Sequence, residues 1–201
     1  SLSSWFSREG FFLINNMLFM GILAACFWGI IYPLITEIIT GQKVTVGPPY
    51  YERTTGPQFA ALLLIMGIAP LVAWRTSTIK RLGHLIWQPT LLSLLAPTIM
   101  ILNNIRHLTA IISLWLAALV FSVTLYEFYR GALARRNSTG HNTIKSLLYL
   151  VQKNRRRYGG YTVHLGVVFI AIGIIGIEMF QQETQKTLSL NEQISLDKYT
   201  I

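Results

Sequence analysis

Charged residues are scarce in this chain of 201 residues: only 12% are Asp, Glu, Lys or Arg, whereas 52% are hydrophobic. Soluble domains carry roughly 25% charged residues, and their helices need a polar face to meet water. The scarcity of charge therefore argues against a soluble globular protein. It indicates a chain that lies mostly in a lipid bilayer.

Cysteine is also nearly absent, and Cys26 is the single example in the sequence. One cysteine cannot form a redox thiol pair or a zinc site built on cysteine pairs, and without a Cys-x-x-Cys-His motif the chain is not itself a c-type cytochrome. Walker, GxGxxG and GxSxG motifs are missing too, so a soluble-type ATPase, dehydrogenase or hydrolase has no support. Cys26 lies in an apolar run and is interpreted as a packing residue.

Long apolar runs are what the sequence has in abundance. Each reaches or exceeds the minimum of about 17 residues that crosses the hydrocarbon layer, and they cover residues 11–39, 58–74, 85–102, 108–126 and 161–180. Pro33, Pro70 and Pro97 fall in the first three runs, where neighbouring helices can satisfy the freed backbone groups. The sequence predicts an all-α membrane protein with about five transmembrane helices.

The basic residues are divided unevenly between the two sets of segments that flank these runs. Twelve of the 17 Lys and Arg residues fall in one set and five in the other. The positive-inside rule assigns the richer set to the cytoplasm or its equivalent, so the N-terminus is predicted inside and the C-terminus outside. Arg155, Arg156 and Arg157 adjoin the last run, which favours contact with anionic lipid head groups over nucleic acid.

The polar segments predict the rest of the architecture. Residues 41–56 are expected to form an outside loop that is extended or turned around Gly47 and the two prolines after it. Residues 143–151 are expected to form a short surface helix within a long inside loop over residues 130–158.

The C-terminal segment differs from the rest of the chain. Residues 187–190 and 193–196 alternate polar and apolar side chains at period two, which predicts short strands. The domain organisation predicted is a helical bundle over residues 1–180 and the start of a small β-rich outside domain over residues 181–201.

Four histidines are the remaining candidates for chemistry. Three of them, His84, His107 and His141, lie in loops or at the edges of spans, where histidine is generally a solvated polar residue. His164 lies about one turn inside the last apolar run, and an ionisable residue there usually faces the bundle interior or a partner.

Two interpretations of His164 remain open from the residues alone. Imidazole is a standard axial ligand of haem iron, and Gly160, Val167 and Ala171 share its helix face, which leaves space for a flat macrocycle. The other interpretation is a histidine hydrogen-bonded to a neighbouring helix without any cofactor.

Several short motifs, taken in order, carry a family resemblance. They are SREG at residues 7–10, VGPPYY at 46–51, GIAPL at 67–71, WR at 74–75, RYGGY at 157–161 and VHLG at 163–166. As an ordered set over nearly the whole chain, they resemble the cytochrome c haem lyases of the CcmF family.

This resemblance implies a role in cytochrome c maturation, in which haem from a haem chaperone is attached to apocytochrome c outside the membrane. It also implies a b-type haem, haem b, held between two intramembrane histidines, of which His164 matches the second. The implied partners are membrane lipids, the haem chaperone, apocytochrome c and the remaining N-terminal part or subunit of the lyase. The implied location is a bacterial or mitochondrial inner membrane.

The candidate cofactor-binding residues are therefore His164, as the metal ligand, with Arg155, Arg156, Arg157, Tyr158 and Gly160. The resemblance also implies a tryptophan-rich outside segment that holds the incoming haem. The five tryptophans of this chain are scattered and do not form that segment, so we expect this chain to be one piece of a lyase. Two alternatives stay open: a cofactor-free structural subunit of a respiratory membrane complex, and a transporter subunit.

Overall fold

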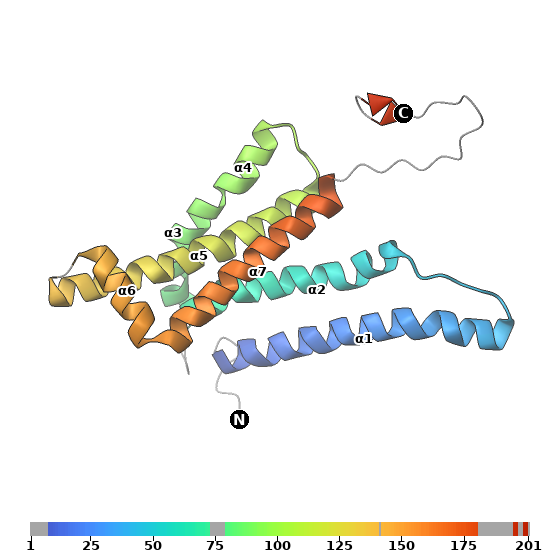
Figure 1. The fold of residues 1–201 in the computed structure, drawn as a ribbon, viewed down its shortest axis with the longest axis horizontal. Coiled ribbons are helices and arrows are strands. Elements are labelled where there is room, and N and C mark those ends of the chain that lie inside the picture. Colours follow the sequence, from blue (N-terminus) through green and yellow to red (C-terminus); the bar gives the residue numbers. More distant parts are fainter. Residues whose placement is uncertain (1–7, 73–78, 141, 181–194, 197–198, 201) are drawn as a thin grey trace.

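The computed structural model describes residues 8–72, 79–140, 142–180, 195–196 and 199–200. Nearly all of these residues are helical (Figure 1). The helices are α1 (Arg8–Thr40), α2 (Pro48–Ile68), α3 (Ile79–Ser93), α4 (Leu95–Leu102), α5 (Leu108–Thr139), α6 (Thr143–Lys153) and α7 (Arg155–Phe180). A 3-10 turn, η1 (Ala69–Leu71), extends α2, and β1 (Ser195–Leu196) pairs antiparallel with β2 (Tyr199–Thr200).

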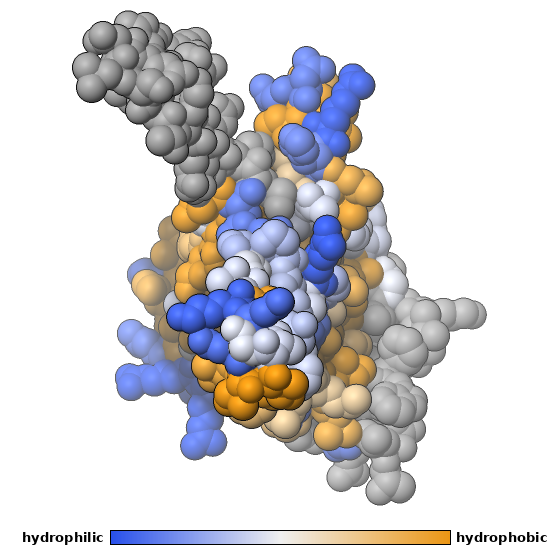
Figure 2. Space-filling model, turned by 90° about the vertical axis from the view of Figure 1, so that its right-hand side faces the viewer, coloured by the Kyte–Doolittle hydropathy of each residue, from blue (hydrophilic) through white to orange (hydrophobic). Residues whose placement is uncertain are grey.

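Five helical stretches of the described chain are long and apolar enough to cross a membrane. They are Glu9–Thr40, Pro48–Leu71, Leu85–Leu102, Leu108–Thr139 and Arg155–Glu178. Figure 2 views the end where α1 joins α2, and hydrophilic residues gather over this end while hydrophobic residues cover the flanks. The expectation of five helices able to span a membrane is confirmed by their length and composition.

Helix α5 lies at the centre of the bundle and contacts α2, α3, α4, α6 and α7. Its side chains Ala117 and Val120 have no exposed surface and pack with Val168 and Ile175 of α7. Small and β-branched side chains at these positions allow α7 to approach α5 closely. The core of the described chain is therefore the contact surface of α5, and α7 is one of the helices built on it.

Helix α1 packs along α2 at the margin of the bundle (Figure 1). Gly29 is buried there, and a methyl group in its place would come within 2.9 Å of ring atoms of Tyr50 and Tyr51. The Tyr50 hydroxyl donates a hydrogen bond of 3.0 Å to the carbonyl oxygen of Ala25. Glycine at position 29 thus permits a close approach that this tyrosine pair fills.

The predicted outside loop over residues 41–56 is wrong in its second half. Gly47 is extended, with φ −92° and ψ 179°, as expected, but α2 begins at Pro48 rather than at residue 58. Prolines occupy the first positions of this helix, where the missing N–H has no intrahelical partner to lose. The two prolines therefore begin the helix instead of prolonging the loop.

The predicted inside loop over residues 130–158 is also wrong, since most of it is helical. Helix α5 continues to Thr139 and ends at Gly140, whose φ of 71° is the left-handed conformation that commonly terminates helices. The short surface helix predicted for residues 143–151 is confirmed as α6. Consequently α5 extends well beyond the predicted end of its span at residue 126.

The third predicted span is present but interrupted between α3 and α4. Pro97 has no N–H to donate to the carbonyl of Ser93, where α3 ends.

At the C-terminus, residues 187–190 and 193–194 lie outside the described residues, and β1 and β2 have two residues each. These two strands do not show the β-rich domain that the alternating pattern predicts.

Candidate functional site

The first turn of α7 follows directly on α6, with Asn154 as the only residue between them. The backbone amides of Arg157 and Tyr158 each donate to the carbonyl oxygen of Asn154 at 3.1 Å. Because α6 also packs on α5, this short connection holds the start of α7 against one end of the central helix.

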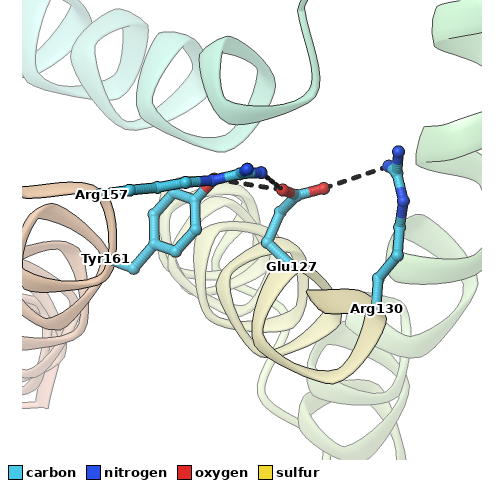
Figure 3. A network of polar contacts seen from close by, with 4 residues as sticks. All are labelled: Glu127, Arg130, Arg157 and Tyr161. Carbon is cyan, nitrogen blue, oxygen red and sulfur yellow. Dashed lines mark hydrogen bonds and ion pairs between the residues drawn. The ribbon is translucent and has the colours of Figure 1, made fainter. Parts of the chain in front are cut away.

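A buried carboxylate of α5 meets this start of α7 (Figure 3). Glu127 is 4% exposed, and its Oε2 accepts hydrogen bonds from Arg157 Nη2 at 2.8 Å and from the Tyr161 hydroxyl at 3.1 Å. Its Oε1 accepts from Arg130 Nη1 at 3.3 Å. Arg157 Nε also donates to the Tyr161 hydroxyl oxygen at 3.1 Å. We call Glu127, Arg130, Arg157 and Tyr161 the Glu127 network.

This network satisfies both carboxylate oxygens of a nearly inaccessible acid. A buried carboxylate without partners would be costly, and charge-assisted hydrogen bonds of this kind are the stronger ones. Arg157 and Tyr161 are four residues apart, so they project from the same side of α7. The network therefore joins α5 and α7 at a defined rotation of α7 about its axis.

Aromatic contacts reinforce the same junction. The Tyr161 ring meets Phe128 of α5 edge-on, with centroids 5.7 Å apart, and meets the Tyr158 ring at 5.8 Å. Tyr158 is itself buried against α5, where its hydroxyl lies over Gly131 and its ring is 5.3 Å from that of Phe128. Such edge and tilted pairs are favourable beyond the area that they bury.

His164 lies on α7 one turn beyond Tyr161, and the two ring centroids are 6.5 Å apart. The imidazole is half-buried, and its Nδ1 is buried with no hydrogen-bond partner among the described residues. An unpaired buried nitrogen costs about 1–3 kcal/mol. The neighbouring helix that would hydrogen-bond this nitrogen in a cofactor-free bundle is not found within the described chain.

The helix face predicted to accommodate a macrocycle is open on one side. Gly160 and Val167 are exposed, while His164 and Ala171 are partly buried. A methyl group added at Gly160 would meet nothing within 4 Å. His164 thus lies at the edge of the contact between α5 and α7, beside a surface that no described helix covers.

The other predicted site residues separate into two groups. Arg157 and Tyr158 face α5, where they contribute to the Glu127 network and its aromatic surroundings. Arg155, Arg156 and Gly160 are exposed. Of the predicted set, only Arg157 and Tyr158 are brought together with α5 close to the ring that contacts His164.

Glu127 is the functional residue that the sequence reasoning missed. The predicted span ended at residue 126 and the predicted loop began at residue 130, so this acid fell between the two and was not examined. A signal was available, since Glu127 is the only acidic residue between Glu52 and Glu178. An isolated acid among many basic residues is a candidate for a buried ion pair.

The described residues contain no group of three or more His, Cys, Asp or Glu side chains suited to hold a metal ion. His107 is exposed at the start of α5, His84 lies within α3, and His141 is outside the described residues. Haem iron needs fewer protein ligands, because the macrocycle supplies its other nitrogens and a single histidine can hold it.

Comparison with known proteins finds curated relatives but no matching family model and no solved structure of significant similarity. The cytochrome c-type biogenesis protein CycK of Rhizobium meliloti is 25% identical over 97% of this chain. CcmF of Pseudomonas aeruginosa is 27% identical over 96% of it. CycK of Bradyrhizobium diazoefficiens is 41% identical over 69 residues, or 34% of the chain.

These similarities cover only part of each relative. The chain spans 28% of the length of the Rhizobium and Pseudomonas proteins and, in the shorter match, 10% of the Bradyrhizobium protein. The resemblance predicted from the ordered motifs is confirmed, as a match to one region of longer proteins.

Proposed function

We propose, starting from this confirmed resemblance to the CcmF and CycK cytochrome c-type biogenesis proteins, that the chain takes part in cytochrome c maturation. Within that role it contributes the second intramembrane haem ligand of a haem lyase, with His164 bound to the iron of a b-type haem. The observation that carries the proposal is a half-buried imidazole within an apolar span, at the edge of a helix face that no described helix covers.

The residues on this face fit such a group. His164 supplies an imidazole whose Nδ1 has no hydrogen-bond partner among the described residues, and Gly160 leaves the helix surface free of a side chain next to it. When bound, a haem would supply one-electron redox chemistry. The second histidine would come from another part of the lyase or from another subunit, as the family resemblance implies.

The basic residues of the first turn have two different roles in this proposal. Arg157 is engaged by Glu127 and serves the junction between α5 and α7. Arg155 and Arg156 are exposed, and they remain available to haem propionates or to anionic lipid head groups. The haem chaperone and apocytochrome c are the partners that this role requires on the outside of the membrane.

The visible spectrum of the chain, purified from membranes together with the chains that accompany it, tests the proposal. We expect low-spin b-type bands on reduction, and a fall in cellular cytochrome c when the gene is deleted. A featureless spectrum with unchanged cytochrome c would contradict the proposal and favour a cofactor-free subunit of a membrane complex or a transporter.

For orientation, we propose that the N-terminus lies inside and the C-terminus outside an inner membrane, with residues 181–201 beginning an outside domain. The basis is the unequal distribution of the 17 basic residues. A topology reporter fused after Arg136 should be active only as an inside reporter, and one fused after Gln181 only as an outside reporter. The opposite result at either position would reverse the assignment.

A further inference from the structure

We propose that Glu127 and Tyr161 are positioning residues that set the direction of the His164 imidazole. This inference rests on the proposed function for the role of His164 as an iron ligand. It adds that the orientation of the His164 ring is determined by the Glu127 network, which lies one helical turn away on the side of α7 that faces α5.

The chain of contacts starts at the central helix. Glu127 is carried by α5, which contacts five other helices and is the most enclosed span of the described chain. Its Oε2 holds the Tyr161 hydroxyl at 3.1 Å, and the same hydroxyl accepts from Arg157 Nε at 3.1 Å. The hydroxyl end of the Tyr161 ring is therefore held in place by hydrogen bonds.

Aromatic contacts hold the Tyr161 ring itself in place as well. Phe128 and Tyr158 both meet the Tyr161 ring nearly at right angles, with interplanar angles of 71° and 89°. The His164 ring then lies against Tyr161, with centroids 6.5 Å apart and a tilt of 55°. Tyr161 is thus the element that links the buried carboxylate to the imidazole.

Apolar packing alone does not fix the rotation of α7. Farther along the helix, α7 contacts α5 through Val168 and Ile175, and apolar contacts are not directional. Hydrogen bonds depend steeply on angle, so the Glu127 network is the directional constraint on α7 rotation. A helix rotation of about 20° would move a side chain about 6 Å from the axis by about 2 Å.

A displacement of that size matters at a metal ligand. Binding groups must be held within about 0.5 Å and 10–20° of their productive geometry. Residues that orient a metal ligand without touching the metal typically change affinity by about 10- to 100-fold when altered. We therefore expect Glu127 and Tyr161 to act on haem binding although neither is proposed to bind the iron.

Tyr161→Phe is the sharpest test, because it keeps the ring and its aromatic contacts and removes only the hydroxyl. In the purified holoprotein, we expect haem loss to excess apomyoglobin to become about 10-fold faster, with a new high-spin fraction in the electron paramagnetic resonance spectrum. Glu127→Gln should act in the same direction. Tyr129→Phe is the matched control, since Tyr129 is an exposed tyrosine of α5 outside the Glu127 network, and it should change neither property.

The outcomes separate this inference from the proposed function. If His164→Ala removes the haem while Tyr161→Phe and Glu127→Gln keep the wild-type spin state and rate of haem loss, positioning is overturned and the ligand role stands. If the wild-type protein carries no haem, both are overturned. A purely structural role would lower the unfolding temperature of Tyr161→Phe without changing the spin state, and that result also counts against positioning.

Discussion

Replacing His164 with alanine is expected to abolish the low-spin b-type haem spectrum of the purified protein. The residues that flank the ligand on α7, Val163 and Leu165, are apolar, and so are Val167 and Val168 on the following turn. None of them provides a nitrogen or oxygen side chain to replace the imidazole. The haem should be lost, or retained as a five-coordinate high-spin species, and optical spectroscopy distinguishes these two results from the wild type.

Added imidazole provides a second test of the same assignment. Alanine leaves the volume of the lost ring empty beside Gly160, where the helix surface is open. Free imidazole should enter this space and restore low-spin bands in the His164→Ala protein. His107→Ala is the matched control, because His107 is exposed at the start of α5, and its spectrum should be unchanged. An unaltered low-spin spectrum in His164→Ala would refute the ligand role.

The second large effect concerns stability. Replacing Arg157 with methionine is expected to lower the free energy of unfolding by about 3 kcal/mol, the lower part of the range for removing one partner of a buried ion pair. We choose the lower part because the Arg157 side chain is 56% exposed, whereas Glu127 is 4% exposed and stays buried in the variant. Denaturant unfolding in bicelles measures the difference.

Arg130→Met is the comparison that makes this prediction specific. Arg130 reaches the other carboxylate oxygen at the longer distance of 3.3 Å, and without it Glu127 keeps its hydrogen bonds from Arg157 and Tyr161, so its removal should cost only about 1 kcal/mol. Combining Arg157→Met with Glu127→Gln should recover part of the loss, because the uncompensated buried charge is then gone. Equal destabilisation by the two arginine variants would contradict the larger contribution assigned to the Arg157 contact.

The five spans could be predicted because membrane insertion depends on the length and composition of each segment, which the sequence gives directly. The start of α2 could not, because Pro48 and Pro49 are compatible both with an extended loop and with the first turn of a helix. Packing of Tyr50 against Ala25 and Gly29 favours the helix. Local rules are insufficient wherever a neighbouring element makes the choice.

The candidate site was predictable to a similar extent. His164 is recognisable because an ionisable residue within an apolar run is unusual. Glu127 was missed because its burial results from Arg157 and Tyr161, which are 30 and 34 residues later in the chain. No local pattern identifies such a pairing before α5 and α7 are brought together.

The connection between α6 and α7 has a mechanical consequence. Arg135 of α5 stacks on the ring of Tyr149 in α6, 3.6 Å from its centroid, and Asn154 alone separates α6 from α7. Because a single residue connects the two helices, we expect a movement of α6 relative to α5 to tilt the N-terminal end of α7. The orientation of the helix that contains His164 is therefore coupled to the position of α6.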